Sequence, residues 1–345
     1  MRVVAVPKRE AEALQKELHR LGLVDRSAKT TKRGDVVLIP VTGEPPIDLA
    51  HYGARFDRDV TLPMRTVPRD PRVLVRAELE AAGIPTSAAP RRWERIGDVL
   101  VIRIPKESQD HAQAIAEIYG RVLHARTVVE DESGIHGPLR TPDVRVLWGE
   151  GTETVHTEGG VRYALDVARV MFSSGNLAER MRIAHRVRPG EVVVDLFAGI
   201  GYFTLPIAVR ARAKAVYACE LNPVSFEYLL KNIRLNRAER VMPLLGDCRE
   251  TAPHGVADWV LMGHFDAREH LDVAFRCVRA KGTIVYHEVC PKEHVPEESV
   301  RRMSEAARAH WMQIVRVEHR IVKSYAPGIV HVVVEARVER LARRS

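Results

Sequence analysis

The chain has 345 residues, of which 46% are hydrophobic and 28% charged, and its 53 basic and 45 acidic side chains leave a net charge of +8. This length suffices for one large domain or two, and no apolar run approaches the roughly 18 residues that a membrane helix needs. The excess of Lys and Arg favours a polyanionic partner, because phosphates that meet these side chains release counterions. Aromatic residues make up only 6%, fewer than a protein that reads long single strands by stacking would carry.

Cysteine usage and the first residues both point to a cytoplasmic protein. The four cysteines are widely spaced and form no Cys-x-x-Cys pair, so neither disulfides nor a metal site is expected. They are Cys219, Cys248, Cys277 and Cys290. Residues 1–8 predict a strand rather than a signal peptide.

Residues 1–75 predict a small α+β domain. Its expected elements are a strand over 3–6, an amphipathic helix over 9–21 and a strand over 35–41. Closely spaced prolines over 62–71 are typical of a linker.

Residues 76–165 predict an intermediate α+β domain. A polar, glycine-containing segment over 133–142 separates two of its strands, and a hairpin is expected to turn at Gly159–Gly160. The other expected elements are a short helix over 78–83, a strand reached through a turn over 95–102, a helix over 109–123, and strands over 127–129 and 144–148.

Residues 166–345 predict a third domain, in which strands and helices alternate after a loop over 171–176 and an arginine-rich helix over 177–187. Strands are expected over 192–197, 215–220, 241–245, 258–262, 283–288, 312–318 and 330–336, and helices over 202–210, 223–236, 266–279 and 297–310. Alternation of this kind predicts a doubly wound parallel sheet with helices on both faces. The last two strands, joined through residues 323–328, fit a closing antiparallel hairpin.

The segment over 192–201 (VVVDLFAGIG) is the strongest functional signal. An apolar strand ends there in Asp-x-Phe-x-Gly-x-Gly, and glycines at 199 and 201 allow a sharp turn that a ligand can approach closely. An acid, Glu220, follows 220 − 199 = 21 residues later at the end of another apolar run. That spacing suits a carboxylate that accepts hydrogen bonds from ribose hydroxyls, so we expect a nucleoside cofactor.

The cofactor that fits best is S-adenosylmethionine. A dinucleotide site would need a third glycine where Thr204 stands, and the chain has no Gly-Lys-Ser/Thr phosphate loop. A further acid, Asp247, closes a third apolar run and could accept a hydrogen bond from an adenine amino group. With the predicted sheet, these residues indicate a Rossmann-like class I methyltransferase fold of seven strands, the last antiparallel, preceded by the smaller α+β domains.

The strand over 258–261 ends in a motif that is unusual for a methyltransferase. Enzymes that methylate base nitrogens typically place Asn/Asp-Pro-Pro-Tyr or Asn-Leu-Pro here, and this chain has Leu261-Met262-Gly263-His264. The motif that holds the target nitrogen is therefore missing. Either the chain is a degenerate methyltransferase or it catalyses a different transfer.

Seven short segments together carry a resemblance to a known family. They are residues 92–99 (RWERIGDV), 165–173 (LDVARVMFS), 195–201 (DLFAGIG), 231–236 (KNIRLN), 262–264 (MGH), 286–287 (YH) and 325–328 (YAPG). With these segments the chain resembles the archaeal wybutosine-synthesis enzymes that transfer an α-amino-α-carboxypropyl group to tRNA. The resemblance runs from about residue 84 to the C-terminus. The first 70 residues are loosely similar to the N-terminal domain of related tRNA guanine-N1 methyltransferases that act beside the anticodon.

The resemblance implies a reaction, a donor and a partner. S-adenosylmethionine would donate its side chain through the γ-carbon, leaving methylthioadenosine. The acceptor would be a ring carbon of 4-demethylwyosine beside the anticodon of phenylalanine tRNA, a base that has to be splayed out of the anticodon stem-loop. The enzyme is expected to act as a monomer. A tRNA guanine-N1 or wyosine-type methyltransferase is the alternative activity.

The resemblance also implies a set of donor contacts. Glu220 is expected to bind the ribose, Asp247 and the backbone of Cys248 the adenine, and Ser173 and Arg180 the methionine part. Cys248 departs from the polar residue expected at its position. The full set is Ser173, Arg180, Asp195, Phe197, Ala198, Gly199, Gly201, Glu220, Asp247, Cys248, Met262 and Gly263.

Attack by a ring carbon ends with loss of a proton, so a base is needed unless water accepts it. His264 and His287 are the preferred candidates, since histidine is tuned for this role near neutral pH, with Asp266 and Glu288 as further ones. Four basic clusters could contact tRNA phosphates. They lie at residues 29–33, 180–188, 301–302 and 340–344.

A non-catalytic RNA-binding protein that keeps the fold is the remaining possibility. The intact turn over 195–201, together with Glu220 and Asp247, argues against it. The sequence leaves open the acceptor base, the catalytic base and the role of the first 75 residues.

Overall fold

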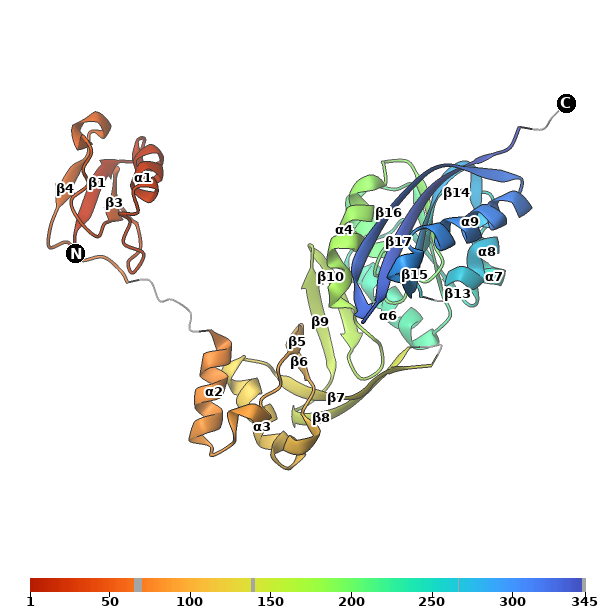
Figure 1. The fold of residues 1–345 in the computed structure, drawn as a ribbon, viewed down its shortest axis with the longest axis horizontal. Coiled ribbons are helices and arrows are strands. Elements are labelled where there is room, and N and C mark those ends of the chain that lie inside the picture. The colour runs from red at the N-terminus through yellow and green to blue at the C-terminus, as the bar shows by residue number, and fades with distance from the viewer. Residues whose placement is uncertain (65–69, 138–139, 266, 343–345) are drawn as a thin grey trace. The chain divides into compact units, whose positions relative to one another are not determined.

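The computed structural model describes residues 1–64, 70–137, 140–265 and 267–342, and the chain separates into two compact units, Met1–Leu74 and Val75–Ser345 (Figure 1). Each unit has its own core. Among the described residues, no helix combines the length and the apolar character needed to cross a membrane.

The first unit is a four-stranded sheet with one α-helix. Its elements are β1 (Val3–Pro7), α1 (Ala11–Arg20), β2 (Thr31–Arg33), β3 (Val36–Pro40), the 3-10 helix η1 (Leu49–Tyr52) and β4 (Arg55–Asp57). The strand order is β2-β3-β1-β4. The central strand β1 is buried along residues 3–6, and Leu14 and Leu18 on the apolar stripe of α1 pack with it, which confirms the predicted strand and helix.

The next part of the chain is a second four-stranded sheet with helices beside it. The elements are α2 (Pro71–Ala81), η2 (Thr86–Ala88), β5 (Trp93–Ile96), β6 (Val99–Ile102), η3 (Lys106–His111), α3 (Ala112–Val122), β7 (Thr127–His136) and β8 (Thr141–Gly149). The strand order is β5-β6-β7-β8. The segment 133–142 was expected to be a connection, but most of it extends β7 and β8. The pairing of two long strands supplies backbone partners that a polar sequence pattern does not reveal.

A hairpin of β9 (Glu153–Glu158) and β10 (Val161–Asp166) follows. Its two-residue turn is Gly159–Gly160, as predicted, with φ of 56° and 78°. A turn with positive φ at both central residues matches the twist of the strands and favours glycine.

The remaining elements form the large sheet and its covering helices. They are η4 (Ser174–Asn176), α4 (Leu177–Arg186), β11 (Val192–Asp195), α5 (Thr204–Arg210), β12 (Ala215–Glu220), α6 (Pro223–Leu235), β13 (Val241–Leu245), α7 (Cys248–Thr251), β14 (Ala257–Met262), η5 (Ala267–His270), α8 (Leu271–Cys277), β15 (Val278–Pro291), η6 (Lys292–His294), α9 (Glu297–Ala309), β16 (Met312–Ala326) and β17 (Ile329–Arg340).

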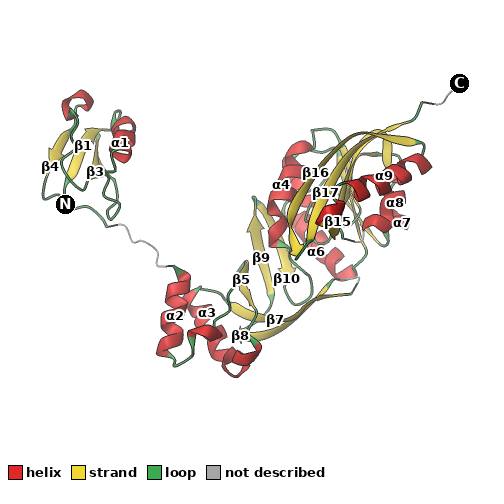
Figure 2. Ribbon diagram, in the orientation of Figure 1, coloured by secondary structure: helices red, strands yellow, loops and turns green. Residues whose placement is uncertain are grey.

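The large sheet has the order β13-β12-β11-β14-β15-β17-β16. Strands β11 to β15 are parallel, and the last strand of the chain, β17, is antiparallel to both of its neighbours. Helices α4, α5 and α6 contribute to one core cluster and α7, α8 and α9 to the other, so both faces are covered (Figure 2). The predicted class I methyltransferase-type sheet is confirmed.

Several boundaries differ from the prediction, most clearly in the last third of the chain. The helix expected over 266–279 is shorter, as α8, because β15 begins at Val278 and extends five residues before the expected start at 283. Strand β16 continues through residues 323–326, which were expected to connect the last two strands, and the turn narrows to Pro327–Gly328. Pairing with β17 extends β16 beyond its apolar residues.

Several side chains on helix α6 and at its C-terminal end connect the hairpin to the part of the chain that forms the large sheet. Asn232 on α6 is fully buried, and its Oδ1 accepts a hydrogen bond from the Ala164 N–H at 2.7 Å. Its Nδ2 donates to the carbonyls of Ala164 and Ile200, each at 3.1 Å. The hairpin and the turn after β11 are therefore fixed to the same helix.

Candidate active site

A cleft of about 340 Å³ lies at the carboxyl ends of the parallel strands, where doubly wound sheets bind their ligands. The turns that follow β11, β12, β13 and β14 supply most of its wall. Its lining residues are Arg140, Met171, Ser173, Asn176, Arg180, Leu196, Phe197, Gly199, Tyr202, Phe203, Glu220, Leu221, Asn222, Ser225, Gly246, Asp247, Cys248, Arg249, Gly263, His264, Phe265, Glu269, His270 and His331.

The turn after β11 depends on a buried acid. The Asp195 carboxylate accepts hydrogen bonds from the Phe197 N–H at 3.3 Å and the Thr204 hydroxyl at 2.8 Å, and burial raises its pKa to about 6. Gly199 has φ of 57°, and a Cβ there would lie 2.5 Å from the Tyr202 ring. Thr204, which stands where a dinucleotide site has glycine, is thus part of the turn.

Glu220 connects this turn to the end of β12. Its Oε2 accepts from the Gly199 N–H at 2.7 Å, and its Oε1 accepts from the Asn222 N–H at 2.8 Å. Burial raises the pKa of Glu220. Each carboxylate oxygen keeps another lone pair, so the group can accept hydrogen bonds from two adjacent hydroxyls.

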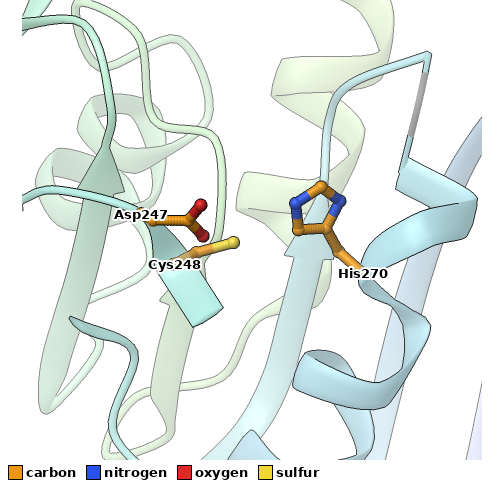
Figure 3. A group of neighbouring side chains, drawn as sticks. All are labelled: Asp247, Cys248 and His270. Carbon is orange, nitrogen blue, oxygen red and sulfur yellow. The ribbon is translucent and has the colours of Figure 1, made fainter. Parts of the chain in front are cut away.

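Asp247, Cys248 and His270 point toward one another across the cleft (Figure 3), with one potential ligand atom from each lying within 4.8 Å of the others. The Asp247 carboxylate accepts from the Arg249 guanidinium, which lowers the pKa of Asp247. Burial raises the pKa of the Cys248 thiol to about 12. The carboxylate and the imidazole offer hydrogen-bond acceptors and a donor, which suit the polar edge of a heterocycle.

Arg180 also lines the cleft and is almost fully buried. Its guanidinium donates to the Glu158 carboxylate and to the Ser173 carbonyl. The Arg180 Cζ lies 5.3 Å and 4.9 Å from the ring centroids of Phe172 and Tyr202, respectively. These contacts hold a positive charge at the cleft with little exposure to water.

Several buried polar atoms of the cleft have no hydrogen-bond partner among the described residues. They are Asn176 Oδ1, Arg180 Nε, His270 Nδ1 and His331 Nδ1. Buried polar groups are normally paired, so their concentration around one cavity indicates a polar ligand.

Most of the predicted site residues meet in the cleft. Those that line it are Ser173, Arg180, Phe197, Gly199, Glu220, Asp247, Cys248, Gly263 and His264. Those that lie behind its wall, in the core or the turn, are Asp195, Ala198, Gly201 and Met262.

The candidate bases have different surroundings. His264 lines the cleft with its ring stacked on Phe197 at a centroid distance of 5.4 Å. His287 lies behind His331, and Glu288 accepts hydrogen bonds from Ser299 and Arg302, so neither is part of the cleft wall. Asp266 lies outside the described residues.

The remaining residues that line the cleft are not among those predicted from the sequence. Tyr202 and Arg249 each lie within two residues of a predicted contact and could have been found by proximity. Phe265 likewise directly follows the predicted residue His264, whereas Arg140 and His331 come from two separate segments that only the fold brings together.

Two of the predicted basic clusters are largely occupied by ion pairs. Their pairs are Arg180–Glu158, Arg182–Glu335, Arg186–Glu318, Arg301–Glu305 and Arg302–Glu288. Binding of phosphates by these side chains would compete with those pairs. Lys29, Lys32 and Arg33 are exposed, and their contact with tRNA stays a prediction, as does that of residues 340–342; residues 343–344 lie outside the described part.

A buried histidine pair should make the protein less stable in acid. His287 Nδ1 and His331 Nε2 are 3.0 Å apart. Burial, reinforced by the positive charges of Arg182 near His287 and Lys323 near His331, lowers their pKa values to about 3 and about 4. Because these groups regain their ordinary pKa on unfolding, the unfolded chain binds more protons below about pH 6.5. The stability from the neutral pair is thus present above pH 6.5 and lost toward pH 4.

The measurement is urea unfolding at pH 7 and pH 4.5 of the native protein and of the His287→Gln/His331→Gln variant. We expect the native protein to lose about 5 kcal/mol more than the variant over this range, about half of it from each histidine. Asp195, whose raised pKa acts in the opposite direction, is present in both proteins and cancels in the difference. Equal losses would contradict the prediction.

Three family models match consecutive parts of the chain. They are described as the tRNA methyltransferase 5 N-terminal domain, over residues 4–49, the TYW2 N-terminal domain, over 77–152, and the TRM5/TYW2 methyltransferase domain, over 154–315.

Among similar proteins, a tRNA(Phe) (4-demethylwyosine(37)-C(7)) aminocarboxypropyltransferase of Methanocaldococcus jannaschii is 40% identical over 72% of this chain and 99% of its own length. The tRNA (guanine(37)-N(1))-methyltransferase Trm5b of Pyrococcus abyssi is 32% identical over 97% of this chain and 98% of its own.

Two solved structures are also similar, each at 35% identity. M. jannaschii TYW2 in complex with AdoMet has a TM-score of 0.62 and covers 72% of this chain and 100% of its own. P. horikoshii TYW2 in complex with MeSAdo has a TM-score of 0.70 and covers 78% and 99%.

Proposed function

This chain belongs to the TRM5/TYW2 family, and on that premise we propose that it transfers the α-amino-α-carboxypropyl group of S-adenosylmethionine to C7 of 4-demethylwyosine in phenylalanine tRNA. It is an S-adenosylmethionine-dependent transferase that acts in the synthesis of wyosine-type bases. The acceptor base lies beside the anticodon.

The main observation in favour of aminocarboxypropyl transfer over methylation is the sequence at the end of β14. Gly263 lines the cleft, and a Cβ at this position would lie 3.0 Å and 3.3 Å from two carbons of the Phe203 ring. The Met262-Gly263-His264 sequence lacks the asparagine and proline that hold a base nitrogen for methylation. The closer identity to the aminocarboxypropyltransferase, 40% against 32%, supports the same choice.

The residues of the cleft fit the donor. When bound, S-adenosylmethionine supplies a sulfonium with three attached carbons, each open to a nucleophile, and orientation selects one of them. We assign Glu220 to the ribose hydroxyls and Asp247, Cys248 and His270 to the adenine edge. We assign Arg180, whose Nε has no hydrogen-bond partner among the described residues, to the donor's carboxylate.

We assign the removal of the ring proton to His264. It lines the cleft immediately after Gly263, next to the turn that follows β11. His287 would act only through His331, because it lies behind that side chain. The transfer would form one bond between the donor's γ-carbon and the ring carbon and break the bond between that γ-carbon and sulfur, so that methylthioadenosine leaves with the electron pair. The proton released from the ring carbon would pass to the His264 imidazole.

We also propose that the three segments of the chain have different roles. Residues 166–345 bind the donor and perform the transfer, while residues 1–75 and 76–165 contact tRNA outside the acceptor base. We further propose that the protein acts as a monomer.

A guanine-N1 methyltransferase is the second candidate. The first unit favours it, because residues 4–49 match the tRNA methyltransferase 5 N-terminal domain and the similarity to Trm5b covers 97% of the chain.

Mass spectrometry of the modified base separates the two activities. Phenylalanine tRNA with 4-demethylwyosine, or with guanine at the same position, is incubated with the full-length protein and S-adenosylmethionine. We expect the mass of one aminocarboxypropyl group to be added to 4-demethylwyosine, with release of methylthioadenosine. A methyl group added to either base, with S-adenosylhomocysteine released, would overturn the proposal.

The same assay tests His264. The His264→Gln variant should transfer the group at least about tenfold more slowly, since general bases typically contribute 10²–10⁴-fold. Its affinity for the donor should stay near that of the native protein. An unchanged rate would mean that another group or water accepts the proton.

A further inference from the structure

The cleft continues outward through a row of aromatic side chains. Phe265, which lines the cleft, contacts the buried His331 at a centroid distance of 5.1 Å. On its other side it contacts Tyr325 at 5.5 Å, with the two rings at 80° to each other. Tyr325 is 58% exposed. The row therefore leads from the buried floor of the cleft to solvent.

The backbone gives Tyr325 a position outside the regular sheet. In the pairing of β16 with β17, Ser324 pairs with Val330 and Ala326 with Ile329, which leaves Tyr325 as an extra residue at a register shift. Bulges of this kind redirect a side chain and occur next to active sites. The edge-to-face contact with Phe265 leaves more than half of the Tyr325 surface exposed to solvent.

Positive charges accompany this aromatic row. The Arg140 guanidinium lies 5.5 Å from the centre of the Phe265 ring. Lys323 lies two residues before Tyr325. Its Nζ is 3.4 Å from the position that a Cβ on Gly175 would occupy. Gly175 itself lies between the cleft residues Ser173 and Asn176 in the sequence. A planar ligand carrying phosphates on either side would find both an aromatic surface and cations here.

We propose that Tyr325 is the stacking residue for the acceptor base, with Phe265 holding its ring in place and with Arg140 and Lys323 facing the flanking phosphates. This rests on the proposed function, because the occupant is the tricyclic base of the tRNA substrate. A base displaced from the anticodon loop loses its stacking on neighbouring bases, and an aromatic side chain replaces it. The ring carbon to be modified is then held at the mouth of the donor cleft.

A double-mutant cycle tests this contact without turnover. Two labelled anticodon stem-loops of identical sequence carry either 4-demethylwyosine or an abasic site at the acceptor position. Dissociation constants are measured by fluorescence anisotropy with full-length native protein, Tyr325→Ala and Tyr325→Phe. Stacking on an aromatic residue is worth about 1–3 kcal/mol, so the native protein should prefer the base-bearing RNA by about 5- to 150-fold.

The Tyr325→Ala variant should lose most of this preference, and Tyr325→Phe should retain it. The matched control is Trp311→Ala, which removes another exposed aromatic, 76% exposed, at the opposite end of β16. Trp311→Ala should retain the preference. Donor affinity should be unchanged in all variants, which shows that the cleft is intact.

The outcomes separate the two proposals. If Tyr325→Ala keeps the preference, or if the native protein shows none, the stacking role is overturned, whatever the mass assay reports. If the preference depends on Tyr325 but the mass assay finds methylation, the stacking role stands and the transfer does not. During turnover, Tyr325→Ala should raise the KM for tRNA more than it lowers kcat.

Discussion

Replacing Glu220 with glutamine should weaken S-adenosylmethionine binding by about 100-fold. The carboxylate accepts hydrogen bonds from the N–H groups of Gly199 and Asn222 and has lone pairs left for two ribose hydroxyls. Glutamine replaces one acceptor oxygen with a donor, which opposes either a backbone N–H or a hydroxyl. Each hydrogen bond to a charged group contributes about 1.5–3 kcal/mol, and 1.4 kcal/mol corresponds to a factor of ten.

Isothermal titration calorimetry with S-adenosylmethionine measures this effect. Glu227→Gln is the matched control, because Glu227 is an exposed glutamate on α6, the helix that follows Glu220. Its dissociation constant should match that of the native protein. Equal affinity of Glu220→Gln and Glu227→Gln would remove Glu220 from the donor site and reopen the assignment of the whole cleft.

Loss of Arg180 should affect both stability and donor binding, and the two effects can be separated. Arg180 and Glu158 form an ion pair in which both side chains are at least nine-tenths buried. Breaking a buried pair leaves an uncompensated charge and costs about 3–5 kcal/mol. We therefore expect Arg180→Met to lower the free energy of unfolding by that amount.

The Arg180→Met/Glu158→Gln variant should recover most of the lost stability, because the unpaired carboxylate is gone. Donor affinity should remain at least about tenfold lower in this variant, since the charge that faces the donor's carboxylate is absent. Urea unfolding and calorimetry on the native protein, both single variants and the double variant complete the cycle. Native-like donor affinity in a stable double variant would make Arg180 a purely structural residue.

The proposed donor site could be predicted from the sequence because its residues lie in short segments of the chain. The strand-turn pattern around Asp195 and the acid at Glu220 each lie within one short segment, and the parallel sheet brings both to the same edge. The structure adds what the pattern does not contain, namely that Asp195 serves the turn while Glu220 faces the cleft.

The ion pairs of the arginine-rich helix α4 could not be predicted from the sequence. Its arginines look alike along the chain, and a phosphate-binding face is a natural interpretation. Their partners, Glu158 on β9, Glu318 on β16 and Glu335 on β17, are distant in sequence, so only the packed structure reveals the ion pairs. The same holds for the rim of the cleft, where a register shift positions Tyr325.

The hydrogen bonds of Asn232 limit how this enzyme can be recombined with its relatives. Its amide connects Ala164, in the hairpin, to Ile200, in the turn after β11. In a chimaera joined after residue 165, Ala164 would come from one parent, and Ile200 and Asn232 would come from the other. A chimaera with exchanged N-terminal segments therefore keeps the turn after β11 in place only if the hairpin of one parent can bind the Asn232 of the other. The hairpin and the large sheet should accordingly be taken from the same parent.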